Sequence, residues 1–121
     1  MHPEDILEWL SQAPQLEGET LNLEYLPSYS GWSLSVPKST VKRDILGSPR
    51  RSLELKITRR HTVQNNSDRL AILSSLEDLA AWAEANPPTG SQLRVTGLPE
   101  FTSRNSSGVE DISITFTLEE G

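Results

Sequence analysis

The chain has 121 residues, of which 35% are hydrophobic, and its 17 acidic and 11 basic side chains give a formal net charge of −6. A chain of this length predicts one domain over residues 1–121 with little apolar surface to spare, and the acidic balance argues against general nucleic-acid binding. The absence of cysteine excludes a disulfide framework, a thiolate metal site and a cysteine nucleophile.

The start of the chain and its hydropathy predict a protein that folds in a reducing cytoplasm without contact with a membrane. The opening segment MHPEDILEWL is acidic and amphipathic, unlike a signal peptide. No run of residues approaches the ~18 apolar side chains that a membrane span needs.

The first predicted elements are a short helix and a strand. An apolar stripe at helical spacing ends before Pro14, and Trp9 lies on the flank of this stripe. After it, Leu21, Leu23 and Tyr25 alternate with polar residues, which predicts a half-buried strand. The stripe consists of Ile6, Leu7, Leu10 and Ala13.

The middle of the chain predicts two strands separated by a loop. The segment WSLSV, residues 32–36, has the composition of a strand. Residues 38–50 have no clear period and combine Pro, Gly and Ser with several bases, so we predict a long loop there. In RSLELKITRR, residues 51–60, apolar and polar residues alternate, which predicts a third strand with one apolar face.

A second helix is predicted after residue 65. Asn66 and Ser67 are the best-placed N-cap candidates, and the helical period runs to about Ala85, where a Pro-Pro pair stops it. Trp82 lies to one side of the apolar face. That face consists of Ile72, Leu73, Leu76, Leu79, Ala80 and Ala83.

Two strands complete the prediction. SQLRVTG is the first, a connection rich in Gly, Pro and Ser follows, and VEDISITFTLEE shows the cleanest alternation in the chain. We expect the edges of this last strand to pair or pack against a neighbouring copy. The order α-β-β-β-α-β-β predicts an α+β fold, with a mostly antiparallel sheet covered by two helices.

Positive charge is concentrated in one part of the chain. Three interpretations stay open for it: a solvated strand face with a flexible loop, a surface for nucleic acid, and an interface with the acidic ends of another subunit. The stretch lacks a recognition helix and interleaved aromatic residues, so we favour the protein interface. Eight of the 11 bases lie between positions 38 and 60, namely Lys38, Lys42, Arg43, Arg50, Arg51, Lys56, Arg59 and Arg60.

The two tryptophans on the helix flanks also have two interpretations. Trp9 and Trp82 lie either at the rim of the chain's own core or at a subunit interface, where Trp is enriched among the residues that dominate binding. The interface candidates are therefore Trp9, Lys42, Arg43, Arg50, Arg51, Arg59, Arg60 and Trp82.

The residue inventory argues against an enzyme. His2 and His61 are the only histidines, and the place of His61 beside a basic strand end predicts a solvated residue rather than a general base. Gly47 and Ser48 are ordinary turn residues and only a weak signal for an anion-binding nest. The carboxylates form no convincing metal pair. We predict no reaction, no cofactor and no metal.

The segments ILEWLSQAPQL, LNLEYL, VKRDILGSPRRSLELKITRR, LEDLAAWAEANPP, QLRVTG and DISITFTLEE follow one another along nearly the whole chain. In this order they resemble the tail terminator, or minor capsid, proteins of long-tailed phages that infect Gram-positive bacteria. The matching residues are Trp9, Leu10, Asn22, Tyr25, Leu26, Lys42, Gly47, Ser48, Arg51 and Trp82. The chain departs from the family pattern at Asp44, Leu46, Ser52, Ser75 and Leu76.

This resemblance implies a structural protein of the virion, at the junction of tail and neck, that assembles in the host cytoplasm. It implies a ring of six copies that caps the finished tail tube and joins it to the head connector. The implied partners are further copies of the chain, the tail tube protein, a head-completion or connector protein, and genomic DNA that passes through the ring. Two alternatives stay open: another head–tail junction protein, and a small nucleic-acid-binding module that uses residues 38–60.

Overall fold

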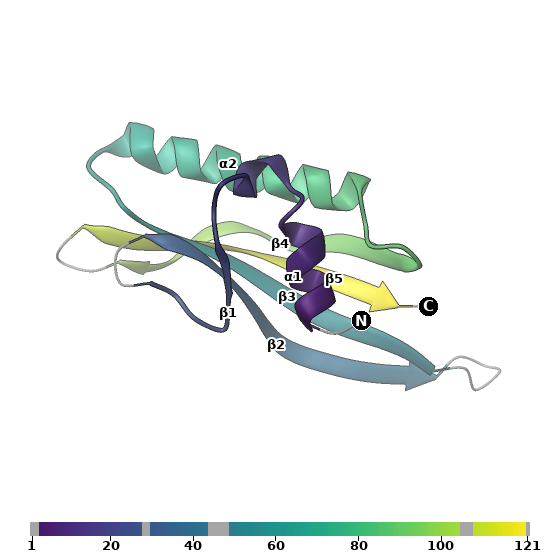
Figure 1. Ribbon diagram of the computed structural model, residues 1–121. Helices are drawn as coiled ribbons and strands as arrows, with labels where there is room; N and C mark the ends of the chain where they lie inside the picture. The colour runs from purple at the N-terminus through teal and green to yellow at the C-terminus, as the bar shows by residue number, and fades with distance from the viewer. Residues whose placement is uncertain (1–2, 28–29, 44–48, 105–107, 121) are drawn as a thin grey trace.

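The described residues form an α+β fold with one sheet and two helices. A computed structural model describes residues 3–27, 30–43, 49–104 and 108–120. Both helices pack into the same hydrophobic core on one face of the sheet (Figure 1). The elements are α1 (Pro3–Leu10), the 3₁₀ turn η1 (Pro14–Leu16), β1 (Leu21–Leu23), β2 (Gly31–Arg43), β3 (Pro49–Thr62), α2 (Asn66–Ala85), β4 (Ser91–Arg104) and β5 (Val109–Glu120).

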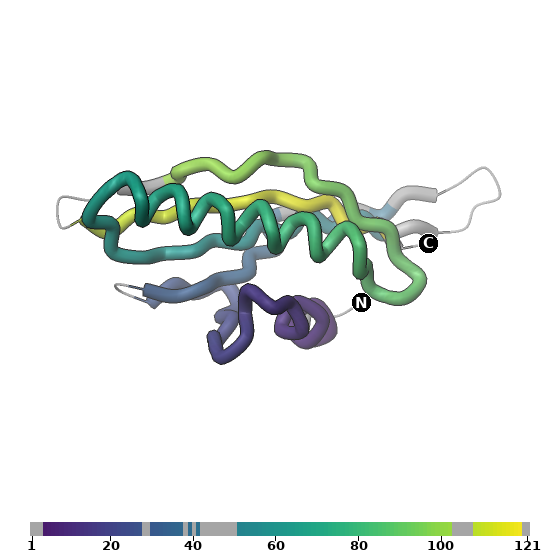
Figure 2. The backbone as a smooth tube through the Cα atoms, turned by 90° about the horizontal axis from the view of Figure 1, so that it is seen from above, coloured from purple at the N-terminus to yellow at the C-terminus, as the bar shows by residue number. Residues whose placement is uncertain are grey.

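The sheet is mixed, with the strand order β1-β2-β3-β5-β4. The short β1 runs parallel to β2, and the other three pairings are antiparallel. Because β1 pairs only with Trp32–Leu34, the remaining outer edge of β2 has no partner strand among the described residues. Helix α2 lies along the sheet, and α1 lies beside it (Figure 2).

The core forms between the sheet and α2. Leu55 lies opposite Phe116 and Ile57 lies opposite Ile114, so these side chains stack in register on the covered face. The sequence-predicted apolar face of α2 is confirmed, because four of its residues are buried against this layer and Ile72 and Leu73 are partly buried. The four buried residues are Leu76, Leu79, Ala80 and Ala83.

The start of the chain covers the rest of this face. Helix α1 ends at Leu10, earlier than predicted, and Pro14 opens η1 rather than stopping a longer helix. This is consistent with Pro at the first position of a helical turn, where its missing N–H is not needed. Ala13 and Leu16 are buried through η1, so the apolar stripe continues into the core by way of the turn.

The prediction of a loop over residues 38–50 is wrong. β2 extends to Arg43 and β3 begins at Pro49, so these residues form the end of a long antiparallel hairpin, and only residues 44–48 lie outside the described part. A shift of register between Ser35 and Lys38 resets the alternation around Pro37. Proline lacks the N–H of a ladder hydrogen bond and is found at edges and bulges, which explains why the period was not visible.

The predicted first strand is also too long, because β1 ends at Leu23. Glu24 has a φ of 54° and turns the chain away, which leaves Tyr25 61% exposed. The Glu24 carboxylate accepts hydrogen bonds from the backbone N–H of Val36 at 2.8 Å and from the hydroxyl of Ser35 at 3.0 Å. A side chain therefore occupies the edge of β2 where the backbone of β1 stops.

The last two strands differ from the prediction in a similar way. The segment expected as a connection belongs to β4 as far as Arg104, and residues 105–107 lie outside the described part; β4 has three register shifts between Val95 and Ser103. β5 lies between β3 and β4, so both of its edges are paired within the chain and the expectation that they pair with a neighbour is wrong. The edges of the sheet are formed by β4 on one side and by β1 and β2 on the other.

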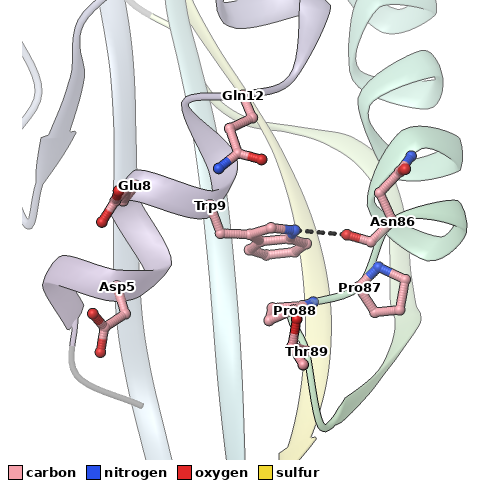
Figure 3. A pocket seen from close by; sticks show the side chains of 8 residues that line it. All are labelled: Asp5, Glu8, Trp9, Gln12, Asn86, Pro87, Pro88 and Thr89. Atoms are coloured by element: carbon pink, nitrogen blue, oxygen red, sulfur yellow. Dashed lines mark hydrogen bonds between the residues drawn. The ribbon is translucent and has the colours of Figure 1, made fainter.

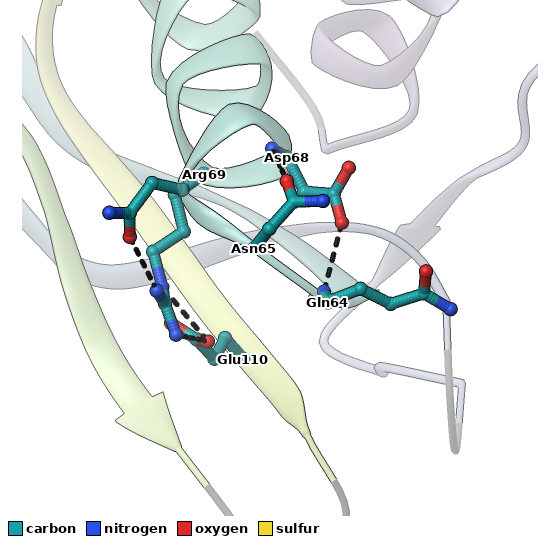
Figure 4. A network of polar contacts seen from close by, with 6 residues as sticks. Gln64, Asn65, Asp68, Arg69 and Glu110 are labelled. Atoms are coloured by element: carbon teal, nitrogen blue, oxygen red, sulfur yellow. Dashed lines mark hydrogen bonds and ion pairs between the residues drawn. The ribbon is translucent and has the colours of Figure 1, made fainter.

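Helix α2 is held to the sheet at its N-terminus by polar contacts (Figure 4). The N-cap is Asn65, one residue before the predicted candidates, and its side chain accepts a hydrogen bond from the N–H of Asp68 at 3.1 Å. Asp68 in turn accepts from the N–H of Gln64 at 2.9 Å. Arg69 donates to Glu110 of β5 at 2.8 Å, and this carboxylate is 5% exposed.

Within the described part of the chain, neither helix has the length and apolar character that crossing a membrane requires.

Candidate functional site

The end of the β2–β3 hairpin is the first part of the candidate site. β5 pairs with β3 from Arg51 onward, where Arg51 lies opposite Glu120, so among the described residues the rungs beyond this point contain β2 and β3 alone. We call these two strand ends, residues 42–43 and 49–50, the hairpin end; it extends past the rest of the sheet (Figure 1).

The hairpin end brings basic residues together in register. Lys42 lies directly opposite Arg50, and Arg43 lies opposite Pro49. Like charges at directly opposed positions of a β-ladder repel each other, so this arrangement costs stability unless acidic groups approach it. The side chains of these three bases lie outside the described part of the structure, as do Gly47 and Ser48 of the weak nest prediction.

Arg60 is engaged within its own chain. Its Nε and Nη2 donate to the two carboxylate oxygens of Asp111 at 2.7 and 2.9 Å, and its Nη1 donates to the backbone carbonyl of Pro27 at 3.0 Å. The hydrogen bond to Asp111 raises the pKa of Arg60. This residue therefore stabilises the uncovered face of the sheet, and a role at an interface stays a prediction.

Arg59 also has intramolecular partners, on the covered face. Its guanidinium lies 5.0 Å from the ring centroid of Trp32, a cation–π contact, and 3.8 Å from the carboxylate of Glu19. Arg51 is half-buried in the three-stranded part of the sheet. Among the sequence-predicted bases, the backbone therefore brings only Lys42, Arg43 and Arg50 together at the hairpin end.

His61 is buried, contrary to the prediction of a solvated residue. It is 8% exposed, and neither ring nitrogen has a hydrogen-bond partner among the described residues. Burial lowers the pKa of His61, and the positive charge of Arg59 lowers it further, whereas Glu110, Asp68 and Asp111 act in the opposite direction. The sequence signal that was missed is the alternation of β3, which places position 61 on the same face as Leu55 and Ile57.

The two tryptophans meet in the chain's own core. Their ring centroids are 5.8 Å apart with an angle of 29° between the planes, and Trp9 is 8% exposed. The indole N–H of Trp9 donates to the backbone carbonyl of Asn86 at 2.7 Å. These contacts match the alternative in which Trp9 and Trp82 belong to the core, and an additional role at an interface stays a prediction.

The helical layer formed by α1 and α2 is acidic. Its only base is Arg69, which is paired with Glu110 of the sheet. Most of its acids are exposed, because the opposite side of each helix is buried in the core, and the exposed Glu84 accepts a hydrogen bond from the backbone N–H of Val95 in β4 at 3.1 Å. The seven acids of the two helices are Glu4, Asp5, Glu8, Asp68, Glu77, Asp78 and Glu84.

An open depression of about 520 Å³ lies between α1 and the α2–β4 connection. We call it the acidic groove, because its described lining residues include two carboxylates and no base. Figure 3 shows the indole of Trp9 reaching across from α1 to Asn86. The lining residues are Asp5, Glu8, Trp9, Gln12, Asn86, Pro87, Pro88 and Thr89. Sequence reasoning missed this groove, because it joins segments about eighty positions apart.

The described residues contain no group of three or more His, Asp or Glu side chains that would hold a metal ion. The arrangement separates charge. The hairpin end carries basic residues, and the helical layer formed by α1 and α2 carries acidic ones. No protein-family model matches the chain, and no curated protein is significantly similar to it.

Proposed function

We propose that this protein is a structural component of a phage virion, a tail-terminator-like protein that forms a ring on the last layer of the tail tube and joins it to the head connector. The resemblance of the ordered segments supports this proposal. The observation that carries it in the structure is the separation of charge between the hairpin end and the helical layer. Complementary patches at different places on one chain allow head-to-tail association, which closes into a ring when the rotation fits.

The unpaired edge of β2 bears on how the copies meet. The described outer edge of β2 beyond Leu34 has no partner strand, and Val41 on it is 63% exposed. An unpaired edge is commonly protected by Lys and Pro residues, which occur here at Pro37, Lys38 and Lys42. We therefore expect copies to meet through side chains at the hairpin end rather than by extension of the sheet.

The decisive experiment is cryo-electron microscopy of the tail end nearest the head. We expect a ring of this chain, with six copies as the resemblance implies, on the last layer of the tube. A double variant, Lys42→Glu with Arg43→Glu, should leave the circular dichroism of the chain unchanged and prevent joining of tails. Arg94→Glu with Arg104→Glu on β4 changes the net charge equally and should allow joining. Absence of the chain from purified virions contradicts the proposal.

The hairpin end also favours a second candidate, a contact with nucleic acid. Three bases at the end of a two-stranded extension suit phosphate groups as well as carboxylates. This function requires binding of the purified chain to DNA at low micromolar protein with a steep dependence on salt. The same Lys42→Glu and Arg43→Glu variant should then lose DNA binding, whereas a virion protein that meets acidic subunits shows no such binding.

A further inference from the structure

We infer that the hairpin end of one copy docks in the acidic groove of a second copy. This inference rests on the proposed function in one respect, namely that the partner is the same chain. It names the two surfaces that meet, which neither the resemblance nor the ring implies.

The first observation concerns the basic partner. The hairpin end places Lys42 opposite Arg50 and adds Arg43 on the same extension, beyond the last rung that β5 completes. In the described part of the chain, no third strand pairs with it. Two opposed bases at the end of such an extension are stabilised when carboxylates approach them from outside.

The second observation concerns the acidic partner. Glu8 lines the groove from α1, is exposed, and makes no hydrogen bond or ion pair with the described residues. Pro87 on the opposite wall is exposed and has no N–H to offer. The wall on the α1 side therefore suits cations, and the rigid proline wall suits the aliphatic stems of Lys and Arg side chains.

The occupant of the acidic groove is the hairpin end of a second copy of the chain. Among the residues whose side chains the structure describes, those that line the groove come from the start of the chain and from the α2–β4 connection, and none comes from β2 or β3. A copy with a net charge of −6 is repelled by another copy unless the contact uses its concentrated bases. The hairpin end is the place where those bases extend from the fold, and the groove is a hollow in the acidic layer with a volume that accepts several side-chain ends.

The contact is tested by crosslinking between separate variants. The chain has no cysteine, so Glu8→Cys and Lys42→Cys each introduce a single thiol. When the two variants are mixed at high concentration with a short bismaleimide, we expect the mixed dimer in roughly tenfold excess over either homodimer. Glu77→Cys is the control for Glu8→Cys, because Glu77 is exposed on α2 outside the groove. Equal yields with Glu8→Cys and Glu77→Cys overturn the inference.

A charge exchange provides the second test. Glu8→Lys and Lys42→Glu should each weaken self-association by about tenfold in sedimentation velocity, and the chain that carries both should recover it. Both variants lie at exposed or edge positions, and circular dichroism verifies that they fold. Failure of the double variant to recover association overturns the docking of these two surfaces.

The outcomes separate this inference from the proposed function. Rings on tail tubes without a crosslink between positions 8 and 42 overturn the docking and leave the proposed function standing. A further variant carries both Glu8→Cys and Lys42→Cys in one chain. If its crosslinked products stop at the dimer, the result supports the docking and contradicts the ring. If the crosslinked products increase in size up to a closed ring, the result supports both the docking and the proposed function.

Discussion

Arg60 and Asp111 form a two-bond ion pair across β3 and β5 on the uncovered face of the sheet. The carboxylate is 8% exposed and the guanidinium 25%. Removal of one partner leaves a largely buried charge without its counter-ion, so we expect Arg60→Ala to lower the free energy of unfolding by about 3 kcal/mol.

Urea unfolding measures this loss, and a second ion pair supplies the control. Arg94 and Glu119 lie 3.3 Å apart with side chains 72% and 45% exposed. Such a solvated pair contributes less than about 1 kcal/mol, so Arg94→Ala should change the stability little. If Arg60→Ala and Arg94→Ala lower the free energy of unfolding by equal amounts, burial does not determine how much these ion pairs contribute.

The contact between Trp9 and Trp82 has a spectroscopic consequence. Two indole rings with centroids 5.8 Å apart couple their electronic transitions, and we expect a paired positive and negative band in the circular dichroism of the dilute monomer. Trp9→Phe and Trp82→Phe should each abolish it, whereas Trp32→Phe should leave it in place. Persistence of the bands without Trp82 excludes the stacked arrangement.

The N-cap of α2 gives a prediction that separates neighbouring residues. Asn65 accepts the N–H of Asp68, so Asn65→Ala should lower the free energy of unfolding by about 1 kcal/mol. Ser67→Ala should have almost no effect, because Ser67 is exposed and has no partner among the described residues. Thermal unfolding compares the two, and a larger effect at Ser67 places the cap elsewhere.

His61 predicts how stability depends on pH. Its folded pKa lies below the ordinary value of 6.5, so the unfolded chain binds a proton at a higher pH than the folded chain does. The free energy of unfolding therefore decreases as the pH falls from about 6.5 to the lowered pKa, and this group contributes no further change below it.

Replacement of His61 should remove this part of the pH dependence. His61→Leu keeps a side chain of similar size and leaves no unpaired ring nitrogen, so we expect unfolding curves that no longer shift with pH in that window. His2→Leu removes the other histidine of the chain and should preserve the shift. An unchanged profile in His61→Leu assigns the dependence to other groups.

Much of the fold follows from patterns visible in the sequence. The alternation of Leu53, Leu55 and Ile57 predicted the covered face of β3, and the Pro-Pro pair predicted the end of α2 at Ala85. These patterns hold because a single period governs each segment, 2 for a strand buried on one face and 3.6 for an amphipathic helix. Composition and element types were sufficient to predict the α+β class.

The sequence-based predictions that were wrong concern segments in which a bulge or a side chain interrupts the alternation of apolar and polar residues. Pro37 hid the continuation of β2, and the positive φ of Glu24 ended β1 where the alternation continued to Tyr25. The sequence predicted that residues 38–50 are basic, but it did not predict that they belong to a long antiparallel hairpin. The acidic groove required knowledge of which distant segments meet, because Trp9 and Asn86 are joined only in the folded chain.

The place of β5 in the sheet determines when the sheet can be completed during synthesis. β5 is the last of the five strands in chain order, yet β3 and β4 are joined only through it. Until residues 109–120 have left the ribosome, the inner edges of β3 and β4 remain open and the apolar side chains of β3 lack their neighbours across the ladder. Pairing over such long sequence separations forms slowly, because loop closure must precede the contacts that reward it. The nascent chain therefore exposes two unpaired strand edges until β5 emerges, and a chaperone has most to protect during that interval.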